Sequence, residues 1–135
     1  MKWNIRSELY YTKSHEWMRE EDERKAAVGI TDYAQDKLGE VVFVELPEEG
    51  KEVEKGESIA VIESVKAVVD SYAPVSGRVV EVNWDLEERP EALNEDPYGE
   101  GWIVKMEVQD KEEVSALMQE EQYREHVIKE EEEVE

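Results

Sequence analysis

The chain has no cysteine and no long apolar run among its 135 residues. Without cysteine it cannot form a disulfide, a thiolate nucleophile or a cysteine-based zinc site. Without a long apolar run it has no candidate transmembrane helix, and its first residues, "MKWNIRSELYY", lack the apolar centre of a signal peptide. We therefore expect a cytoplasmic protein with no membrane partner.

Basic residues are scarce relative to acidic ones: 16 Lys and Arg against 37 Asp and Glu give a formal net charge of −21. Proteins that bind nucleic acid or anionic membranes need an excess of Lys and Arg to contact phosphate groups. The charge therefore argues against both kinds of partner. It favours contacts with basic patches on other proteins.

Groups typical of catalysis or metal binding are also few. The sequence has no Gly-rich phosphate loop and no Ser/His/Asp set, which argues against an enzyme. The two histidines, His15 and His126, lie far apart in the sequence and lack the spacing of metal ligands. We expect exposed or packing roles for both, and no metal site.

What the sequence does contain is a series of short segments rich in β-branched and apolar residues, separated by turn residues. This pattern predicts a mainly β protein of one domain. A short helix is expected over residues 31–39, because Asp32 and Gln35 have the spacing of a capping box and Gly39 can end the helix. Strands are expected over residues 15–21, 24–30, 40–46, 58–63, 68–72, 78–83 and 101–108, and near Val53.

The last part of the chain changes to a helical pattern from Asp110 onward. Asp110 and Glu113 form a second capping-box pattern, and short helices are expected at about residues 110–128. The single domain is therefore expected to cover residues 1–128. The like-charged run over residues 129–135 is expected to fray into solvent as an acidic tail.

Two similar segments, "GEVVFV" (residues 39–44) and "GRVVEV" (residues 77–82), lie on either side of a central hairpin. Two related strand units favour a β-sandwich of two related halves. In that arrangement the central hairpin projects at one end of the sandwich. The turn of the hairpin falls at Val65-Lys66.

Lys66 is unusual as a turn residue. Two-residue hairpin turns usually require positive φ, which Gly, Asn and Asp supply and which Val65 and Lys66 do not favour. Such breaks of local rules concentrate at functional positions. A lysine amine can form a Schiff base, act as a base or accept an acyl group, but the first two roles need a free amine, and the nearby acids Glu63 and Asp70 favour the ammonium form. Acylation of Lys66 by another enzyme remains.

The segment "ESVKAVVDSYAPVSGRVVEVN" resembles the lipoyl-attachment region of the glycine cleavage H proteins. The resemblance extends through "YTKSHEW", "VGITDYAQDKLGEVVFVELPEEG", "VEKGE" and "NEDPYGEGW" to the helical C-terminal part. It implies a lipoyl/biotinyl-type β-sandwich, also called a barrel-sandwich hybrid. It also implies that lipoate is joined to Lys66 through an amide.

The resemblance further implies a non-catalytic carrier of the glycine cleavage system. Its lipoyl arm would accept an aminomethyl group from glycine decarboxylase and deliver it to a tetrahydrofolate-dependent aminomethyltransferase. Dihydrolipoyl dehydrogenase would then reoxidise the arm, and a lipoate ligase or octanoyl transferase would attach it. Two alternatives stay open: an H-like carrier that relays lipoyl or octanoyl groups to other proteins, and a biotinyl carrier, whose lysine usually has Met on both sides where Val65 and Ala67 stand here.

Two groups of site residues around Lys66 follow from the resemblance. The hairpin and its recognition by a ligase would involve Glu63, Ser64, Val65, Ala67, Gly56 and Gly77. A cleft that receives the loaded arm would involve Glu16, Trp17, Lys37, Val69 and Asp70. Val69 and Lys37 differ from residues common in the family. Glu16 and Asp70 are either plain surface acids or, as we expect, the groups that hold the ammonium of the cargo.

Overall fold

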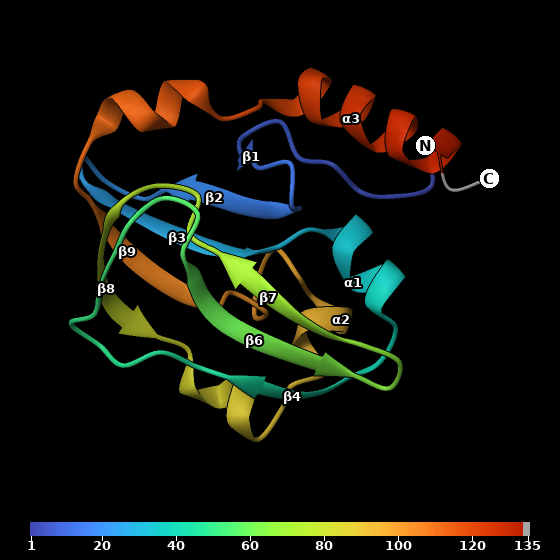
Figure 1. The fold of residues 1–135 in the computed structure, drawn as a ribbon, viewed down its shortest axis with the longest axis horizontal. Coiled ribbons are helices and arrows are strands. Elements are labelled where there is room, and N and C mark those ends of the chain that lie inside the picture. Colours follow the sequence, from blue (N-terminus) through green and yellow to red (C-terminus); the bar gives the residue numbers. More distant parts are fainter. Residues whose placement is uncertain (134–135) are drawn as a thin grey trace.

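The computed structural model describes residues 1–133, in which nine strands form two antiparallel sheets (Figure 1). The larger sheet has the order β1-β2-β3-β9-β8-β5 and the smaller sheet has the order β4-β6-β7. The expected mainly β architecture is confirmed, and each expected strand is present. The strands are β1 (Tyr10–Tyr11), β2 (Glu16–Glu20), β3 (Lys25–Ile30), β4 (Val41–Glu45), β5 (Glu52–Val53), β6 (Ser58–Ser64), β7 (Val68–Tyr72), β8 (Gly77–Val82) and β9 (Val104–Val108).

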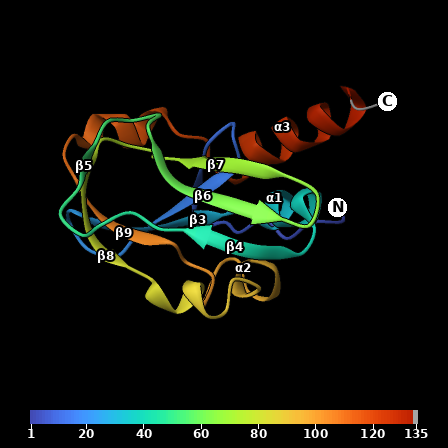
Figure 2. The same cartoon turned by 60° about the horizontal axis from the view of Figure 1, so that its bottom comes forward.

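The two sheets bury a common apolar core between them (Figure 2). Met18, Val28 and Met106 of the larger sheet and Ile62 of the smaller sheet are fully buried. Burial of each such side chain contributes roughly 1.5–3 kcal/mol. The two segments of similar sequence form β4 and β8, which lie in different sheets, as a sandwich of two halves requires.

Short helices connect the strands and cover the ends of the sheets. The helices are α1 (Asp32–Leu38), the 3₁₀ helix η1 (Trp84–Glu87), α2 (Ala92–Glu95), the 3₁₀ helix η2 (Lys111–Ala116) and α3 (Glu120–Glu133). No helix within the described residues is both long enough and apolar enough to cross a membrane.

The sequence predicted a capping box that starts at Asp32, but Asp32 is the first residue of α1 and not its N-cap. Thr31 is the N-cap, and its hydroxyl accepts a hydrogen bond from the amide of Ala34. The amide group of Gln35 donates to Asp32 at 2.8 Å, so the expected pair forms within the first turn instead. A hydroxyl one residue earlier in the chain satisfies the same free amide groups.

Of the capping box expected at Asp110 and Glu113, only the N-cap at Asp110 is confirmed. Asp110 caps η2 by accepting from the amide of Glu112, but η2 is a 3₁₀ helix. The Glu113 carboxylate turns away to accept hydrogen bonds from Ser76, at 2.7 Å from its amide and 3.1 Å from its hydroxyl. Glu113 therefore ties η2 to the turn before β8 instead of closing a capping box.

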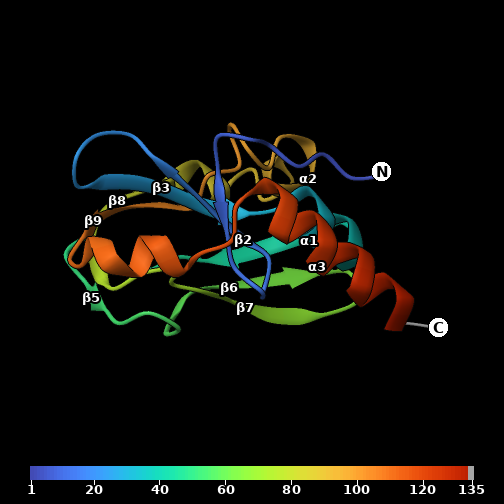
Figure 3. The ribbon, with the colours of Figure 1, turned by 90° about the horizontal axis from the view of Figure 1, so that it is seen from above.

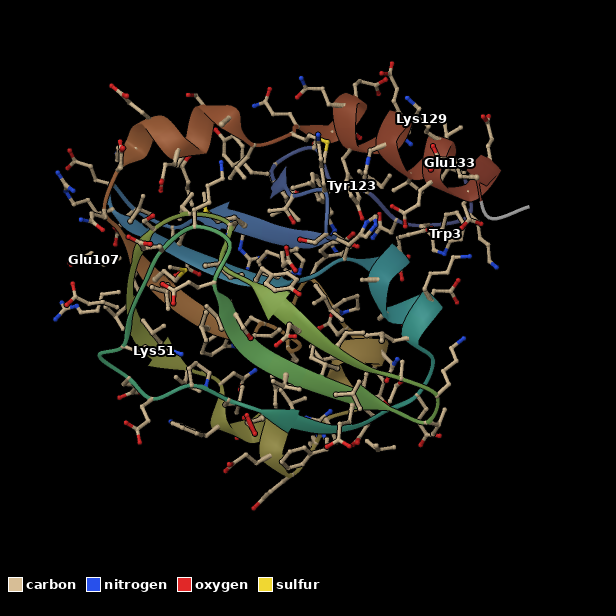
Figure 4. All side chains as sticks on the ribbon, viewed as in Figure 1. Trp3, Lys51, Glu107, Tyr123, Lys129 and Glu133 are labelled. Atoms are coloured by element: carbon tan, nitrogen blue, oxygen red, sulfur yellow. The ribbon has the colours of Figure 1, made fainter. Side chains whose placement is uncertain are left out.

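Helix α3 continues to Glu133, so the expectation that the chain frays from residue 129 is wrong as far as Glu133; residues 134–135 lie outside the described part. A second apolar cluster holds α3 in place, and in it the rings of Tyr11 and Tyr123 stack at 4.3 Å. Figure 3 shows α3 alongside α1, and Figure 4 shows Tyr123 beneath α3 on the side of the strands. The helix is therefore part of the fold and not a solvated tail.

Candidate functional site

Lys66 lies in the turn of the β6–β7 hairpin, at the end that projects from the smaller sheet (Figure 1). Val65 and Lys66 are the two turn residues, because the amide of Ser64 donates to the carbonyl of Ala67 at 2.8 Å. Among the described residues His15 is the only non-glycine with positive φ. The turn therefore forms without the positive φ that we expected a two-residue hairpin to require.

The side chain of Ser64 explains how this turn closes. Its hydroxyl oxygen accepts hydrogen bonds from the amide of Lys66 at 3.3 Å and the amide of Ala67 at 3.1 Å. A serine hydroxyl can replace a backbone carbonyl in this way. Val65 and Val68 remain 65% and 64% exposed, so an enzyme that approaches Lys66 meets a valine on each side of it.

The turn is also tied to the chain that leaves α1. The amide of Val65 donates to the carbonyl of Glu40 at 3.0 Å. Gly39 ends α1 with a φ of 74°, and a Cβ placed there would lie 3.6 Å from Cε of Lys66. The stem of the lysine therefore passes over the end of α1, and the segment that follows α1 packs against the turn.

Asn94 on α2 holds the Gly39 segment, and the sequence interpretation missed it. Its amide nitrogen donates to the carbonyl of Gly39 at 2.8 Å and to the side-chain oxygen of Gln35 at 3.1 Å. Its amide oxygen accepts from the amide of Val41 at 2.9 Å. All three partners lie more than 50 residues earlier in the chain, so no local pattern could have identified Asn94.

The Lys66 side chain is exposed and forms no ion pair with any residue of the described part. Neither nearby acid forms an ion pair with it. Asp70 accepts a hydrogen bond from Ser58 at 2.8 Å, and Glu63 sits opposite Val68 in the strand register. The amine is therefore open to an acylating enzyme.

The two glycines expected to help recognition both have a backbone reason to be glycine. Gly77 packs so closely on β9 that a Cβ there would collide with the carbonyl oxygen of Glu107. Gly56 has a φ of 89° and precedes β6. β6 has seven residues, which span about 23 Å at 3.3 Å per residue. Gly56 therefore lies at the end of the hairpin opposite Lys66.

A cleft of about 330 Å³ opens beside the hairpin, where α1, β7 and α3 meet. Four of the five residues expected to form an arm cleft line it: Glu16, Lys37, Val69 and Asp70. Ala67 also lines it, so the cleft begins one residue from Lys66. The structure thus brings residues of β2, α1 and the β6–β7 hairpin together beside the lysine.

Trp17, the fifth expected residue, does not line the cleft. Successive side chains of a strand point to opposite faces of the sheet. Glu16 faces the cleft, whereas Trp17 is fully buried in the second apolar cluster. Its indole nitrogen donates to the carbonyl of Pro97 at 2.9 Å. Trp17 is therefore a core residue.

Glu16 is only 1% exposed and is not the surface acid that we considered. One carboxylate oxygen accepts from the hydroxyls of Thr12 and Ser14, the latter at 2.6 Å. The other oxygen accepts from the amide of Tyr72 at 3.0 Å. Glu16 therefore joins the loop before β2 to β7 of the other sheet, and three donors stabilise its buried charge.

Two acids of α3, from the segment expected to fray, lie at the cleft: Glu130 lines it, and Glu131 contacts two residues that line it. Both oxygens of Glu130 lie 3.0 Å from Nε2 of His15. Glu131 accepts from the hydroxyl of Tyr33 at 2.7 Å and pairs with Lys37 at 2.8 Å. Burial, together with these carboxylates, raises the pKa of Tyr33. These contacts hold the last two turns of α3 against α1.

His15 links α3 to the loop before β2, and its backbone is left-handed, with a φ of 74°. Its Nδ1 lies 2.8 Å from the hydroxyl of Tyr123, which in turn lies 2.7 Å from the hydroxyl of Thr31. Burial lowers the pKa of His15, and this outweighs the opposite effect of Glu130. The rings of His15 and His126 are 5.3 Å apart, although the two histidines lie far apart in the sequence.

Comparison with known proteins gives a consistent result. Residues 9–131 match the profile of the family described as Glycine cleavage H-protein. The chain is 55% identical to the glycine cleavage system H protein of Thermotoga maritima over 120 residues, which are 89% of this chain and 96% of that protein. It is 54% identical to the Thermus thermophilus H protein, over 90% of this chain and 94% of that one. The crystal structure of a glycine cleavage system H protein from Mycobacterium marinum superposes with a TM-score of 0.79 at 38% identity, over 88% of this chain and 95% of that chain.

Proposed function

The chain belongs to the glycine cleavage H-protein family, and on that basis we propose that it carries lipoate in amide linkage to Nζ of Lys66. The observation that carries the proposal is the presentation of this lysine. Lys66 is exposed in a turn that Ser64 closes and that a hydrogen bond to Glu40 fixes in place. A side chain on so well supported a turn suits recognition by an acylating enzyme.

When bound, the lipoyl dithiolane supplies the sulfur that accepts an aminomethyl group from glycine decarboxylase, yields it to the aminomethyltransferase and is reoxidised by dihydrolipoyl dehydrogenase. The residues of this chain attach, present and shelter the arm. Acylation removes the charge of Lys66, so its stem can lie over Gly39 without the burial of an ammonium group. Attachment to one rigid hairpin also raises the effective concentration of the arm at each partner enzyme.

The cleft beside the hairpin is the proposed shelter for the loaded arm. The cargo carries a protonated amine, and a nearby carboxylate favours that charged form. Asp70 is exposed and accepts one hydrogen bond, from Ser58, so it can accept another from an ammonium group. Glu16 already accepts from three donors. We therefore assign the ammonium to Asp70, and to Glu16 the task of fixing the cleft wall.

The apolar part of the cleft has a separate task. Val69 and Ala67 line the cleft next to the attachment point, and Ile62 and Leu38 line it further in. Apolar walls reduce the access of water to the bond between the cargo carbon and sulfur. This arrangement would protect a cargo that water can otherwise hydrolyse.

A carrier that only relays lipoyl or octanoyl groups to other proteins would need the same lysine and hairpin. It would not need an acid beside the arm, because its cargo has no amine. The presence of Asp70 in a cleft next to Lys66 therefore favours the glycine cleavage role. The net charge of −21 suits docking to basic surfaces of the partner enzymes.

Mass spectrometry of the protein co-expressed with a lipoate ligase tests the attachment. We expect one lipoyl increment, located on Lys66 by peptide mapping, and none in the Lys66→Arg variant. Lys55→Arg is the matched control, because Lys55 is exposed in the turn that precedes β6 at the other end of the hairpin. A lipoyl group on another lysine, or a biotinyl increment, would contradict the proposal.

A further inference from the structure

Two imidazoles and a carboxylate form a cluster where α3 meets the loop before β2. His15, His126 and Glu130 each offer one ligand atom, and these atoms lie within 4.8 Å of one another. We propose that this cluster binds a divalent transition-metal ion, with zinc as the best fit. The site would lie at the edge of the cleft, which His15 and Glu130 also line.

The spacing of the ligand atoms suits a tetrahedral ion. With zinc–ligand bonds of about 2.0–2.1 Å, the ligand atoms of a tetrahedral site lie about 3.3 Å apart. Oε1 of Glu130 is 3.0 Å from Nε2 of His15 and 3.5 Å from Nε2 of His126. These two separations bracket the required value, and all three ligand atoms lie within 4.8 Å of one another.

His15 is already oriented as a metal ligand. Its Nε2 faces Glu130, and its Nδ1 is held by the buried hydroxyl of Tyr123 at 2.8 Å. Metal-bound histidines usually have such a partner on the second ring nitrogen, which fixes the tautomer and the ring orientation. The left-handed backbone of His15 is a conformation that persists where the surroundings enforce it.

His126 and Glu130 are four residues apart on α3 and therefore project from the same face of the helix. Two ligands with this helical spacing are a common feature of zinc sites. Nε2 of His126 now contacts the carbonyl oxygen of Lys13 at 2.9 Å. Metal binding through Nε2 would replace that contact, and the ring proton would then lie on Nδ1.

The chemistry of the ligands selects the kind of ion. Imidazole nitrogens favour zinc, copper, nickel and iron, whereas magnesium and calcium prefer oxygen ligands. Two histidines and one glutamate are a ligand set found in zinc enzymes, where water occupies the fourth position. Two neutral imidazoles and one carboxylate leave a positive charge on the bound ion, which the net charge of −21 of the chain favours.

A bound ion would fasten α3 to the rest of the fold. His15 belongs to the loop before β2, and the other two ligands belong to α3. Because α3 forms part of the cleft rim, metal binding would also fix that wall of the cleft. The site does not involve Lys66, so it can be tested on the chain without lipoate.

Calorimetric titration of the metal-free, full-length protein with zinc, and with magnesium as the control ion, tests the proposal. We expect one zinc ion per chain and a rise in Tm of roughly 5–10 °C at a zinc concentration about 100-fold above Kd. His126→Ala and His15→Asn should each weaken zinc binding by about tenfold or more. Asn is chosen for His15 because it tolerates a left-handed backbone.

Glu130→Gln removes the third ligand, and Glu132→Gln is its matched control because Glu132 is exposed on the same helix. Zinc binding should weaken in the first variant and stay unchanged in the second. Cobalt substitution should give the visible absorption of a four-coordinate site in the wild type and lose it in His126→Ala. Equal zinc affinity in the wild type and the ligand variants would overturn the proposal, and so would magnesium binding as tight as zinc binding. In either case the acidic surface alone would explain why the ion binds.

Discussion

The backbone amide of Val65 donates a hydrogen bond to the carbonyl of Glu40 at 3.0 Å, and this contact joins the lysine-bearing turn to the chain that leaves α1. The tip of a hairpin is otherwise among the more mobile parts of a fold. Here the tip is held on one side by Glu40 and on the other by the hydroxyl of Ser64. The position of Lys66 is therefore set by its neighbours, while its own side chain stays free for modification.

Replacement of Ser64 by alanine should slow lipoylation severalfold. The change removes the acceptor for the amides of Lys66 and Ala67, and the loss of these two hydrogen bonds should lower the free energy of unfolding by about 1 kcal/mol. The initial rate of modification by a lipoate ligase, compared with that of Ser115→Ala, is the measurement. Ser115 also has a side-chain hydrogen bond to the backbone, but in η2. Equal rates in the two variants would show that the Ser64 hydroxyl does not matter for recognition.

Replacement of Asn94 by alanine should loosen the turn from a distance. Without Asn94 the carbonyl of Gly39 and the amide of Val41 lose their partners, which should lower the free energy of unfolding by about 1–3 kcal/mol. The neighbouring carbonyl of Glu40 should then hold Val65 less firmly. Amide hydrogen exchange measures this directly: we expect faster exchange at Val65. Faster exchange at Val41 with no change at Val65 would mean that the turn does not depend on Asn94.

The strands and the position of Lys66 in the hairpin turn could be predicted from the sequence because their signals are local. Segments rich in β-branched and apolar residues, separated by turn residues, located β2, β3, β4 and β6 to β9 to within a few residues. An unusual turn pair, Val65-Lys66, pointed to the functional position without any knowledge of the rest of the fold. The hydroxyl that closes that turn also lies next to it in the sequence, at Ser64.

The walls of the cleft could not be predicted in the same way, because they depend on contacts between distant segments. The burial of Glu16 requires Tyr72, which belongs to the other sheet. The last turns of α3 are held by contacts with His15 and Tyr33. The local sequence of these turns is a run of like charges. A rule based on neighbouring charges predicts fraying there, and packing against residues from the start of the chain overrides it.

Substitution of Lys66 by arginine and of Glu16 by glutamine should affect stability very differently. Lys66 is exposed and its side chain has no hydrogen bond or ion pair among the described residues, so Lys66→Arg should change the free energy of unfolding by less than about 0.5 kcal/mol. Glu16→Gln places an NH₂ group among three donors in a buried position. This change should lower the free energy of unfolding by about 1–3 kcal/mol. Urea unfolding of both variants is the measurement. Similar midpoints would contradict either the burial of Glu16 or the freedom of Lys66.

Asp70→Asn should accelerate the loss of ammonia from the loaded carrier. The proposed carboxylate–ammonium contact keeps the cargo amine protonated, and the neutral amine has the lone pair that expels the sulfur. Asp70 is exposed, so the contact contributes about 0.2–1 kcal/mol and its loss should increase the rate roughly two- to fivefold. The measurement is ammonia release from the lipoylated, loaded protein in the absence of the aminomethyltransferase.

Asp85→Asn is the matched control for this experiment, because Asp85 is an exposed aspartate in η1 that does not line the cleft. The same loss of charge at Asp85 should leave the release rate unchanged. Salt should reduce the difference between wild type and Asp70→Asn, since the contact is open to solvent. If Asp70→Asn and Asp85→Asn release ammonia at the same rate, Asp70 has no part in holding the cargo. The attachment of lipoate to Lys66 would be unaffected by that result, because it depends on the turn and not on the cleft.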